Sequence, residues 1–356
     1  MKTIHFIVIL ILQTVLACRS ESPTEKYQSE RNNVVDVHSK NPKVIKLSSE
    51  VLLKESEVFM KYPYKVKVLD SLVFLWDLHG VNKFFHIYSF PDLKYIISFG
   101  SKGKGSNELV NAGGFVVDKG KMFVFDSFKA DLYIYSIDSL LHGSTTPLQV
   151  VAYPPECIPV LAFTKVEDKF AILSFDGKDR VIFADSIGHV LERRYNYPID
   201  KEVSVPLYQN FLASLWDSFL DYNPQNKILS LATKLGDVLE IYNLKDQTEY
   251  IVIGKGGKPD IVEKNGGFSI GRIDGFSDIQ VKDKHIYALY SGLERTGEST
   301  PEGGNYIYVY DLKGHLEKIY ELEQYINGFD IHEDEKAVYA VSSGDNLISK
   351  YTLHSN

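Results

Sequence analysis

Cysteine is scarce in this chain of 356 residues, which contains two: Cys18 and Cys157. Cys18 directly follows an apolar leader, so the folded part of the chain keeps a single thiol and an internal disulfide is excluded. Cys157 lies in the proline-flanked segment YPPECIP, with no histidine nearby to activate it. We therefore expect a buried apolar residue in a rigid turn, and not a catalytic nucleophile.

Long hydrophobic runs and catalytic spacings are missing as well. The apolar stretch at residues 4–17 contains fourteen residues, and a membrane helix needs ~20. The sequence has no HxH or HExxH pair, no GxSxG and no GxxxxGK[ST]. An excess of acidic side chains gives a formal net charge of −8, so nucleic acid is not an expected partner.

Helical periodicity is hard to find after residue 43, with residues 207–219 as the one short candidate. What is present instead is a repeated segment that ends in an aromatic pattern such as FHIYS or LYIYS. Its fourth residue recurs at intervals of 41 to 68 residues, at Tyr88, Tyr135, Ala184, Tyr242, Tyr310 and Tyr351. A period of about 50 residues is typical of propeller blades or solenoid turns.

Each repeat contains four short runs that alternate between polar and apolar residues, the pattern of half-buried strands. Tyrosine and phenylalanine are abundant, with 23 and 20 residues. Four antiparallel strands per repeat predict an all-β fold, a six-bladed β-propeller; a sandwich tandem or an open solenoid is the alternative. The last repeat ends without an outer strand, and residues 42–53 alternate suitably. We therefore expect this N-terminal strand to close the last blade.

The N-terminus predicts export. Residues 1–17 carry one charge, on Lys2, and end in VLAC, which matches a bacterial lipobox except for Leu16. We expect a signal peptide at residues 1–17, a lipidated Cys18, a flexible tether at residues 18–42 and the propeller at residues 43–356. The predicted address is the bacterial cell envelope, as an outer-membrane lipoprotein on its periplasmic or surface face. An ordinary secretory signal that happens to contain a cysteine is the alternative.

Propellers commonly bind ligands at one mouth of the central channel, where the loops between the second and third strands meet the loops between blades. Two of the glycine-rich inter-blade loops, residues 100–114 and 254–275, lack phosphate-loop spacing and are expected to serve the backbone. From loop position and side-chain type we predict ligand-facing residues at Trp76, Asp77, His79, Asp126, Arg272, Glu294 and Arg295. The expected partner is a peptide, a glycan or an envelope protein, bound without catalysis and without a cofactor.

A calcium-dependent hydrolase or lyase of the lactonase-like propeller type is the alternative function. In that case carboxylates from several blades would hold the ion in the channel. The residues that could supply the oxygen ligands are Asp126, Asp176, Asp217, Asp274 and Glu294.

The inter-blade segment FGSKGKGSNEL, together with the repeats and the lipobox, resembles the TolB-like six-bladed β-propeller lipoproteins of Bacteroidetes. The family pattern is close to FGxxGxGPxEF, and Ser106 takes the place of its proline. The matching positions are Phe99, Gly100, Gly103, Gly105, Glu108 and Leu109. The resemblance covers nearly the whole mature sequence and implies the fold and a cell-envelope address. None of these motifs is catalytic, so the ligand stays open.

Overall fold

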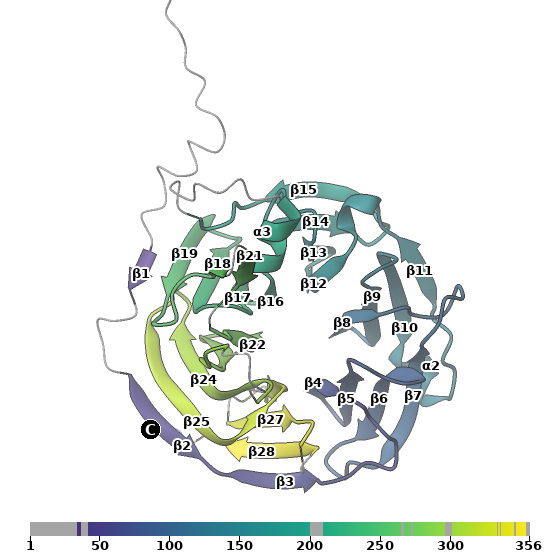
Figure 1. Ribbon diagram of the computed structural model, residues 1–356. Helices are drawn as coiled ribbons and strands as arrows, with labels where there is room; N and C mark the ends of the chain where they lie inside the picture. The colour runs from purple at the N-terminus through teal and green to yellow at the C-terminus, as the bar shows by residue number, and fades with distance from the viewer. Residues whose placement is uncertain are drawn as a thin grey trace, which may run out of the picture. The chain divides into compact units, whose positions relative to one another are not determined.

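The computed structural model describes residues 34–36, 42–199, 209–264, 267–271, 273–295, 301–332, 334, 336–344 and 347–353. Within these ranges six sheets of four or five strands follow one another around a central axis (Figure 1). This confirms the predicted six-bladed propeller of antiparallel blades. The predicted signal peptide, Cys18 and Arg272 lie outside the described residues.

Strands run from the centre of the ring to its rim within each blade. Blades one to three are β4 (Pro63–Leu69), β5 (Leu72–Asp77), β6 (Lys83–Ser89) and β7 (Tyr95–Ser101); β8 (Ala112–Asp118), β9 (Lys121–Asp126), β10 (Asp131–Ser136) and β11 (Gln149–Ala152); β12 (Val160–Val166), β13 (Lys169–Ser174), β14 (Val181–Asp185) and β15 (Val190–Arg194). Blades four to six are β16 (Ser218–Asn223), β17 (Ile228–Thr233), β18 (Val238–Asn243) and β19 (Thr248–Ile253); β22 (Phe276–Val281), β23 (His285–Tyr290), β24 (Gly304–Asp311) and β25 (Leu316–Ile326); β26 (Gly328–Ile331), β27 (Ala337–Val341), β28 (Ile348–Thr352) and β3 (Ser49–Leu53).

The N-terminal strand closes the ring, as predicted, but it does so with its second half. β3 pairs antiparallel with β28 and completes blade six. β2 (Lys43–Leu47) instead pairs parallel with β25 as a fifth strand of blade five. β25 is eleven residues long and offers a free outer edge, so the incoming chain adds to it before it crosses to blade six. At the crossing, the Glu323 side chain accepts hydrogen bonds from the backbone N–H and the hydroxyl of Ser49.

One part of the expected tether is a strand. β1 (Val34–Asp36) pairs parallel with β19 and adds a fifth strand to blade four. Val34 and Val35 are adjacent β-branched residues in an otherwise polar segment, and such side chains fit a pleated edge. The chain therefore follows the rim of blades four, five and six in order, as β1, β2 and β3 (Figure 1).

Helices are few in the described ranges. α3 (Gln209–Leu215) lies inside the stretch that was predicted helical and leads directly into β16. α2 (Ile137–Leu141) was not predicted; Ser136 caps its N-terminus by accepting a hydrogen bond from the backbone N–H of Ser139. A short 3₁₀ turn, η2 (Pro155–Cys157), and the hairpin of β20 (Ile261–Lys264) and β21 (Gly267–Ile270) lie in connections between blades. None of the described helices has the length and apolar character needed to cross a membrane.

The repeated aromatic position lies on the third strand of every blade. Its side chains are at most 2% exposed. Hydrophobic clusters occupy each of the six interfaces between neighbouring blades, including the interface between blades six and one. Burial of one such aromatic side chain contributes roughly 2–3 kcal/mol. The repeated sequence thus forms the contacts between blades and leaves the channel to residues that are not repeated.

Candidate ligand-binding site

The innermost strands depart from regular pairing at one end of the channel. In the described residues, four of the six inner strands have a register shift at their first residues, in β4, β8, β12 and β22. A bulge inserts an extra residue into a strand and redirects its side chain. The residues at these shifts are Tyr64, Gly113, Gly114, Leu161 and Ser277. All of them line one cavity, which lies at the end of the channel where the inter-blade loops enter; we call this end the upper mouth.

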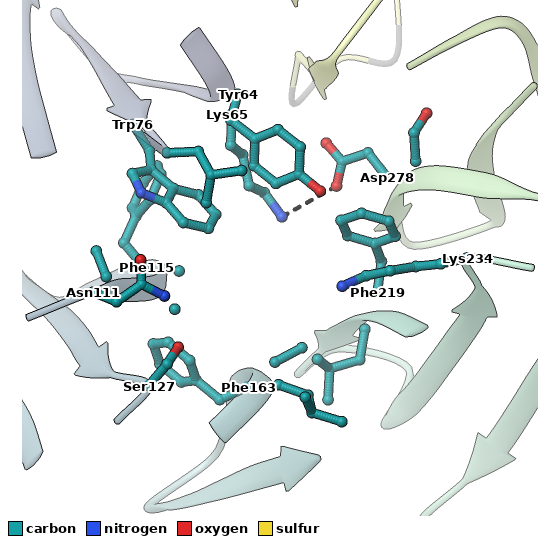
Figure 2. Close-up of a pocket in the computed structure, with 18 residues that line it drawn as sticks. Tyr64, Lys65, Trp76, Asn111, Phe115, Ser127, Phe163, Phe219, Lys234 and Asp278 are labelled. Atoms are coloured by element: carbon teal, nitrogen blue, oxygen red, sulfur yellow. Dashed lines mark ion pairs between the residues drawn. The ribbon is translucent and has the colours of Figure 1, made fainter. Parts of the chain in front are cut away.

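The inner cavity of the upper mouth measures about 170 Å³ and has aromatic walls. Trp76 is 6% exposed, and its indole meets the Tyr64 ring edge-on, with 5.1 Å between the ring centroids. Phe115 and Phe163 close the side formed by blades two and three, and Phe219 lies opposite (Figure 2). Such walls exclude water from any group that enters between them.

A wider outer cavity of about 490 Å³ continues the inner one towards solvent. The two cavities share Tyr64, Leu78, Phe219, Lys234 and Ser277. The outer cavity adds further aromatic groups at Tyr62, His79 and Phe276; the rings of Tyr62 and His79 lie 5.4 Å apart. We refer to both cavities together as the upper pocket.

Two lysines bring positive charge into the upper pocket. Lys65 Nζ lies 3.2 Å from Asp278 Oδ1, and Lys234 Nζ lies 2.7 Å from Asp217 Oδ2. Lys234 Nζ also lies 5.0 Å from the centre of the Phe219 ring, a cation–π distance. Both amino groups point towards the central space, as does the amide of Asn111 on the other side (Figure 2). Each ion pair fixes its lysine in place while other N–H groups of the ammonium face the cavity.

Several hydrogen-bonding atoms in the pocket are buried without a partner. Within the described part of the chain, Trp76 Nε1, Ser277 Oγ and Ser291 Oγ make no hydrogen bond. Trp76 and Ser291 are each 6% exposed. A buried polar atom without a partner costs about 1–3 kcal/mol, so a protein that keeps three such atoms beside one pocket gains when a ligand satisfies them.

The channel wall is polar on one side because of a regular set of aspartates, which we call the aspartate ladder. Asp221, Asp278 and Asp330 stand on the inner strands of blades four, five and six. Each accepts a hydrogen bond from the inner-strand backbone of the following blade, with distances of 2.7 Å to Val281 N, 3.1 Å to Phe329 N and 2.9 Å to Val68 N. Burial raises the pKa of Asp278, and the Lys65 ammonium opposes that shift.

The opposite end of the channel holds a third cavity of about 630 Å³, lined by the turns between first and second strands. It shares Lys65, Phe115, Phe163 and Leu220 with the inner cavity of the upper pocket. These four side chains therefore form the layer that separates the two cavities. Lysine and carboxylate side chains alternate around this lower cavity, and the Lys165 pair with Asp118 at 2.9 Å is one example.

The structure distributes the seven predicted ligand-facing residues over different environments. Trp76 lines the inner cavity and His79 the outer one. Asp77 and Asp126 are buried, and their carboxylates cap loops. Asp77 accepts from the backbone N–H groups of Lys61, Tyr62 and His79; Asp126 accepts from those of Val110, Phe128 and Lys129.

The predicted residues of the long blade-five loop lie at the rim. Glu294 and Arg295 are exposed, and neither lines a described cavity. Arg295 Nε lies 3.3 Å from Asp274 Oδ1, and Asp274 does line the outer cavity. Arg272 stays a prediction outside the described residues.

The carboxylates that were considered as calcium ligands are engaged separately. Asp176 pairs with Arg193 at 2.9 Å, Asp217 with Lys234 and Asp274 with Arg295. Among the described residues no three His, Cys, Asp or Glu side chains form a group that could hold a metal ion. Cys157 is buried, and burial raises the pKa of its thiol to about 11, which keeps it protonated at neutral pH.

Sequence reasoning missed most of the pocket. The missed residues come from the starts of inner strands, where a bulge interrupts the alternation that marks a strand: Tyr64, Lys65, Asn111, Phe115, Phe163, Phe219, Lys234, Ser277, Ser291 and Asp278. The glycine pair at 113 and 114 was a usable signal. Gly114 has φ of +130°, and a Cβ on Gly113 would lie 2.3 Å from Ser127 Oγ.

The model of a TolB-like six-bladed propeller family matches residues 40–334. The chain belongs to this family. No curated protein matches it in sequence. Among solved structures, a protein of Bacteroides fragilis whose name classes it as exported is 13% identical, with a TM-score of 0.56 over 88% of this chain and 100% of the other.

Two eukaryotic-type repeat domains show the same architecture at lower identity. The WD40 repeats of RRP9 are 9% identical, with a TM-score of 0.52 over 86% of this chain and 97% of the other. The WD40 domain of Pan2 from Neurospora crassa is 11% identical, with a TM-score of 0.50 over 83% and 90%. At these identities the likeness concerns the fold of this propeller alone.

Proposed function

We propose that this propeller is a non-enzymatic binding protein of the bacterial cell envelope and that its upper pocket takes a peptide segment of a partner. The observation that carries the proposal is the pocket itself. Aromatic walls surround a deep slot, and the buried polar atoms of Trp76, Ser277 and Ser291 beside it lack protein partners. An apolar side chain in the slot and a peptide backbone beside it would satisfy both features.

A peptide fits the slot better than a flat sugar ring does. Carbohydrate recognition on tryptophan needs an accessible ring face, and Trp76 is 6% exposed with its indole against Tyr64. A side chain enters a narrow slot end-on and needs no exposed platform. The interior wall of Phe115, Phe163 and Phe219 offers the apolar contacts that bury such an anchor.

A binding role without catalysis agrees with the polar groups of the pocket. Lys65 and Lys234 each hold an ion pair, and the His79 ring packs against Tyr62. Among the described residues no hydroxyl that lines the pocket is hydrogen-bonded to a histidine, which is the arrangement that activates a serine nucleophile. We propose that the protein acts without a metal or an organic cofactor.

The proposed location follows from the N-terminal sequence. A lipid on Cys18 would hold the propeller at the outer membrane, where its partners are envelope proteins. Mass spectrometry of the membrane fraction would test this, since lipidation adds the mass of acyl chains to a chain that begins at Cys18.

The binding proposal is tested by titrating the protein with a pool of soluble peptides that end in or contain aromatic and aliphatic residues. Phe219→Ala removes one wall of the slot, and we expect it to weaken binding by about tenfold or more. Phe59→Ala is the matched control, because Phe59 is 76% exposed and lies outside the pocket. The proposal fails if no peptide binds, or if both variants bind equally well as the unchanged protein.

A further inference from the structure

The inner cavity offers hydrogen-bond donors and few unoccupied acceptors. The groups that can donate into it come from Lys65, Lys234, Trp76, Asn111, Ser127 and Ser277. Asp278 is the acidic residue among the lining side chains of this cavity. Its carboxylate already accepts from the backbone N–H groups of Phe329 and Ile279 and pairs with Lys65.

A donor-rich cavity suits a group that only accepts hydrogen bonds. An ionised carboxylate has two oxygens and about four lone-pair sites, and it has no donor. The two ammonium groups that point into the cavity from Lys65 and Lys234 would stand on either side of such a group (Figure 2). Hydrogen bonds between charged partners are stronger than neutral ones, and they gain further where water is excluded.

The floor of the cavity decides how a polypeptide can enter. The layer of Lys65, Phe115, Phe163 and Leu220 lies between the upper pocket and the lower cavity. A chain that enters from the upper mouth meets this layer and ends there. The inner cavity of about 170 Å³ is also much smaller than the outer one of about 490 Å³, so the narrow part receives one residue and the wide part receives the residues before it.

From these observations we infer that the upper pocket binds the carboxyl-terminal end of a polypeptide whose last side chain is apolar. The inference rests on the proposed function and narrows its ligand. The terminal carboxylate lies between the amino groups of Lys65 and Lys234, and the last side chain packs among Trp76, Phe115 and Phe163. The preceding residues follow the outer cavity past Tyr62 and Phe276.

The test compares two versions of one probe with the unchanged protein. The pentapeptide Ac-Ala-Ser-Ala-Gly-Phe with a free carboxylate is titrated beside the same peptide with a carboxamide end. The free acid is expected to bind at least about tenfold more tightly, because the amide loses the charge that the two lysines recognise. Equal affinities that are both weakened by Phe219→Ala overturn the chain-end inference and leave peptide binding intact. Absence of binding by either peptide overturns both.

Two further arms separate the source of the carboxylate and the role of the lysine. N-acetylphenylalanine presents the same end group without a chain; if it binds as tightly as the pentapeptide, a small aromatic acid is the ligand and the chain-end inference is wrong. The double variant Lys234→Met with Asp217→Asn removes one amino group without leaving its partner charged. We expect it to reduce the preference for acid over amide several-fold, whereas Lys121→Met, at an exposed lysine outside the pocket, keeps it. A preference that survives the double variant unchanged contradicts the inference.

Discussion

Asp330 of blade six accepts a hydrogen bond from the backbone N–H of Val68 in blade one, with 2.9 Å between Oδ2 and N. The other oxygen of the same carboxylate lies 2.9 Å from Lys67 Nζ. Blades six and one come from opposite ends of the propeller sequence, so this contact closes the ring at its centre while β3 closes it at the rim.

Removal of the Asp330 carboxylate is predicted to open this closure. Asp330→Ala leaves the Val68 N–H and the Lys67 ammonium without their acceptor, and we expect the free energy of unfolding to fall by about 3 kcal/mol. Urea unfolding at pH 7 measures the change. Asp92→Ala, at a 68% exposed side chain, is the control and should stay within about 0.5 kcal/mol. Equal effects of the two substitutions would refute a central role for the Asp330 contact.

Stepwise N-terminal truncation is predicted to separate the two kinds of rim strand. A chain that begins at residue 54 lacks β3 and leaves the edge of β28 unpaired, so we expect aggregation or loss of cooperative unfolding. A chain that begins at residue 42 loses β1 but keeps β2 and β3, and its stability should fall by less than about 2 kcal/mol. Size-exclusion chromatography and thermal melting distinguish the outcomes. A well-folded monomer from the shorter chain would contradict the closure described here.

Acid is predicted to destabilise the protein through His86. This side chain is 2% exposed, and its burial lowers the pKa from 6.5 to about 4. Because the unfolded chain binds the proton more readily, stability falls as the pH drops from about 6.5 to about 4, by a total of about 3 kcal/mol from this group. His86→Phe should flatten that part of the curve, as measured by urea unfolding at pH 7, 5.5 and 4.5. A curve of unchanged slope in the variant would show that other groups cause the acid loss.

The loop residues Asp77 and Arg295 are predicted to behave in opposite ways. Asp77→Ala removes the acceptor of three backbone N–H groups and should lower stability by about 2 kcal/mol. Arg295→Ala breaks a half-exposed ion pair with Asp274 and should change stability by less than about 0.5 kcal/mol. Thermal melting of both variants checks the pair. If Arg295 contributes to ligand binding, its variant will bind peptide more weakly at an unchanged melting temperature.

The blades were predictable because their strands follow a simple physical rule. Alternation at period two marks a half-buried strand, and the aromatic residue in the third strand recurs in every blade, as at Tyr88 and Tyr310. The N-terminal closure was predictable from an unfilled edge. The division of that segment between blades five and six was not, because the pairing of β2 depends on the extra length of β25.

The pocket was much harder to predict than the blades. Trp76 and His79 were found because they lie in a loop between the second and third strands. Tyr64, Phe163 and Ser277 sit at or beside bulges, where the side-chain direction depends on which residue the partner strand skips. The pairing of Lys65 with Asp278 joins blades one and five across the channel, and one sequence contains no signal for such a contact.

The indole N–H signals of the two tryptophans provide the most direct test of the upper pocket. Trp76 and Trp216 are the two tryptophans of the chain, and both indole N–H groups are buried without a partner in the described structure. Trp216 packs in a separate cluster beside α3, so it serves as an internal control. On titration of ¹⁵N-labelled protein with the free-acid pentapeptide, the account predicts a saturable shift of the Trp76 signal and a constant Trp216 signal. A constant Trp76 signal while the peptide binds would contradict the account.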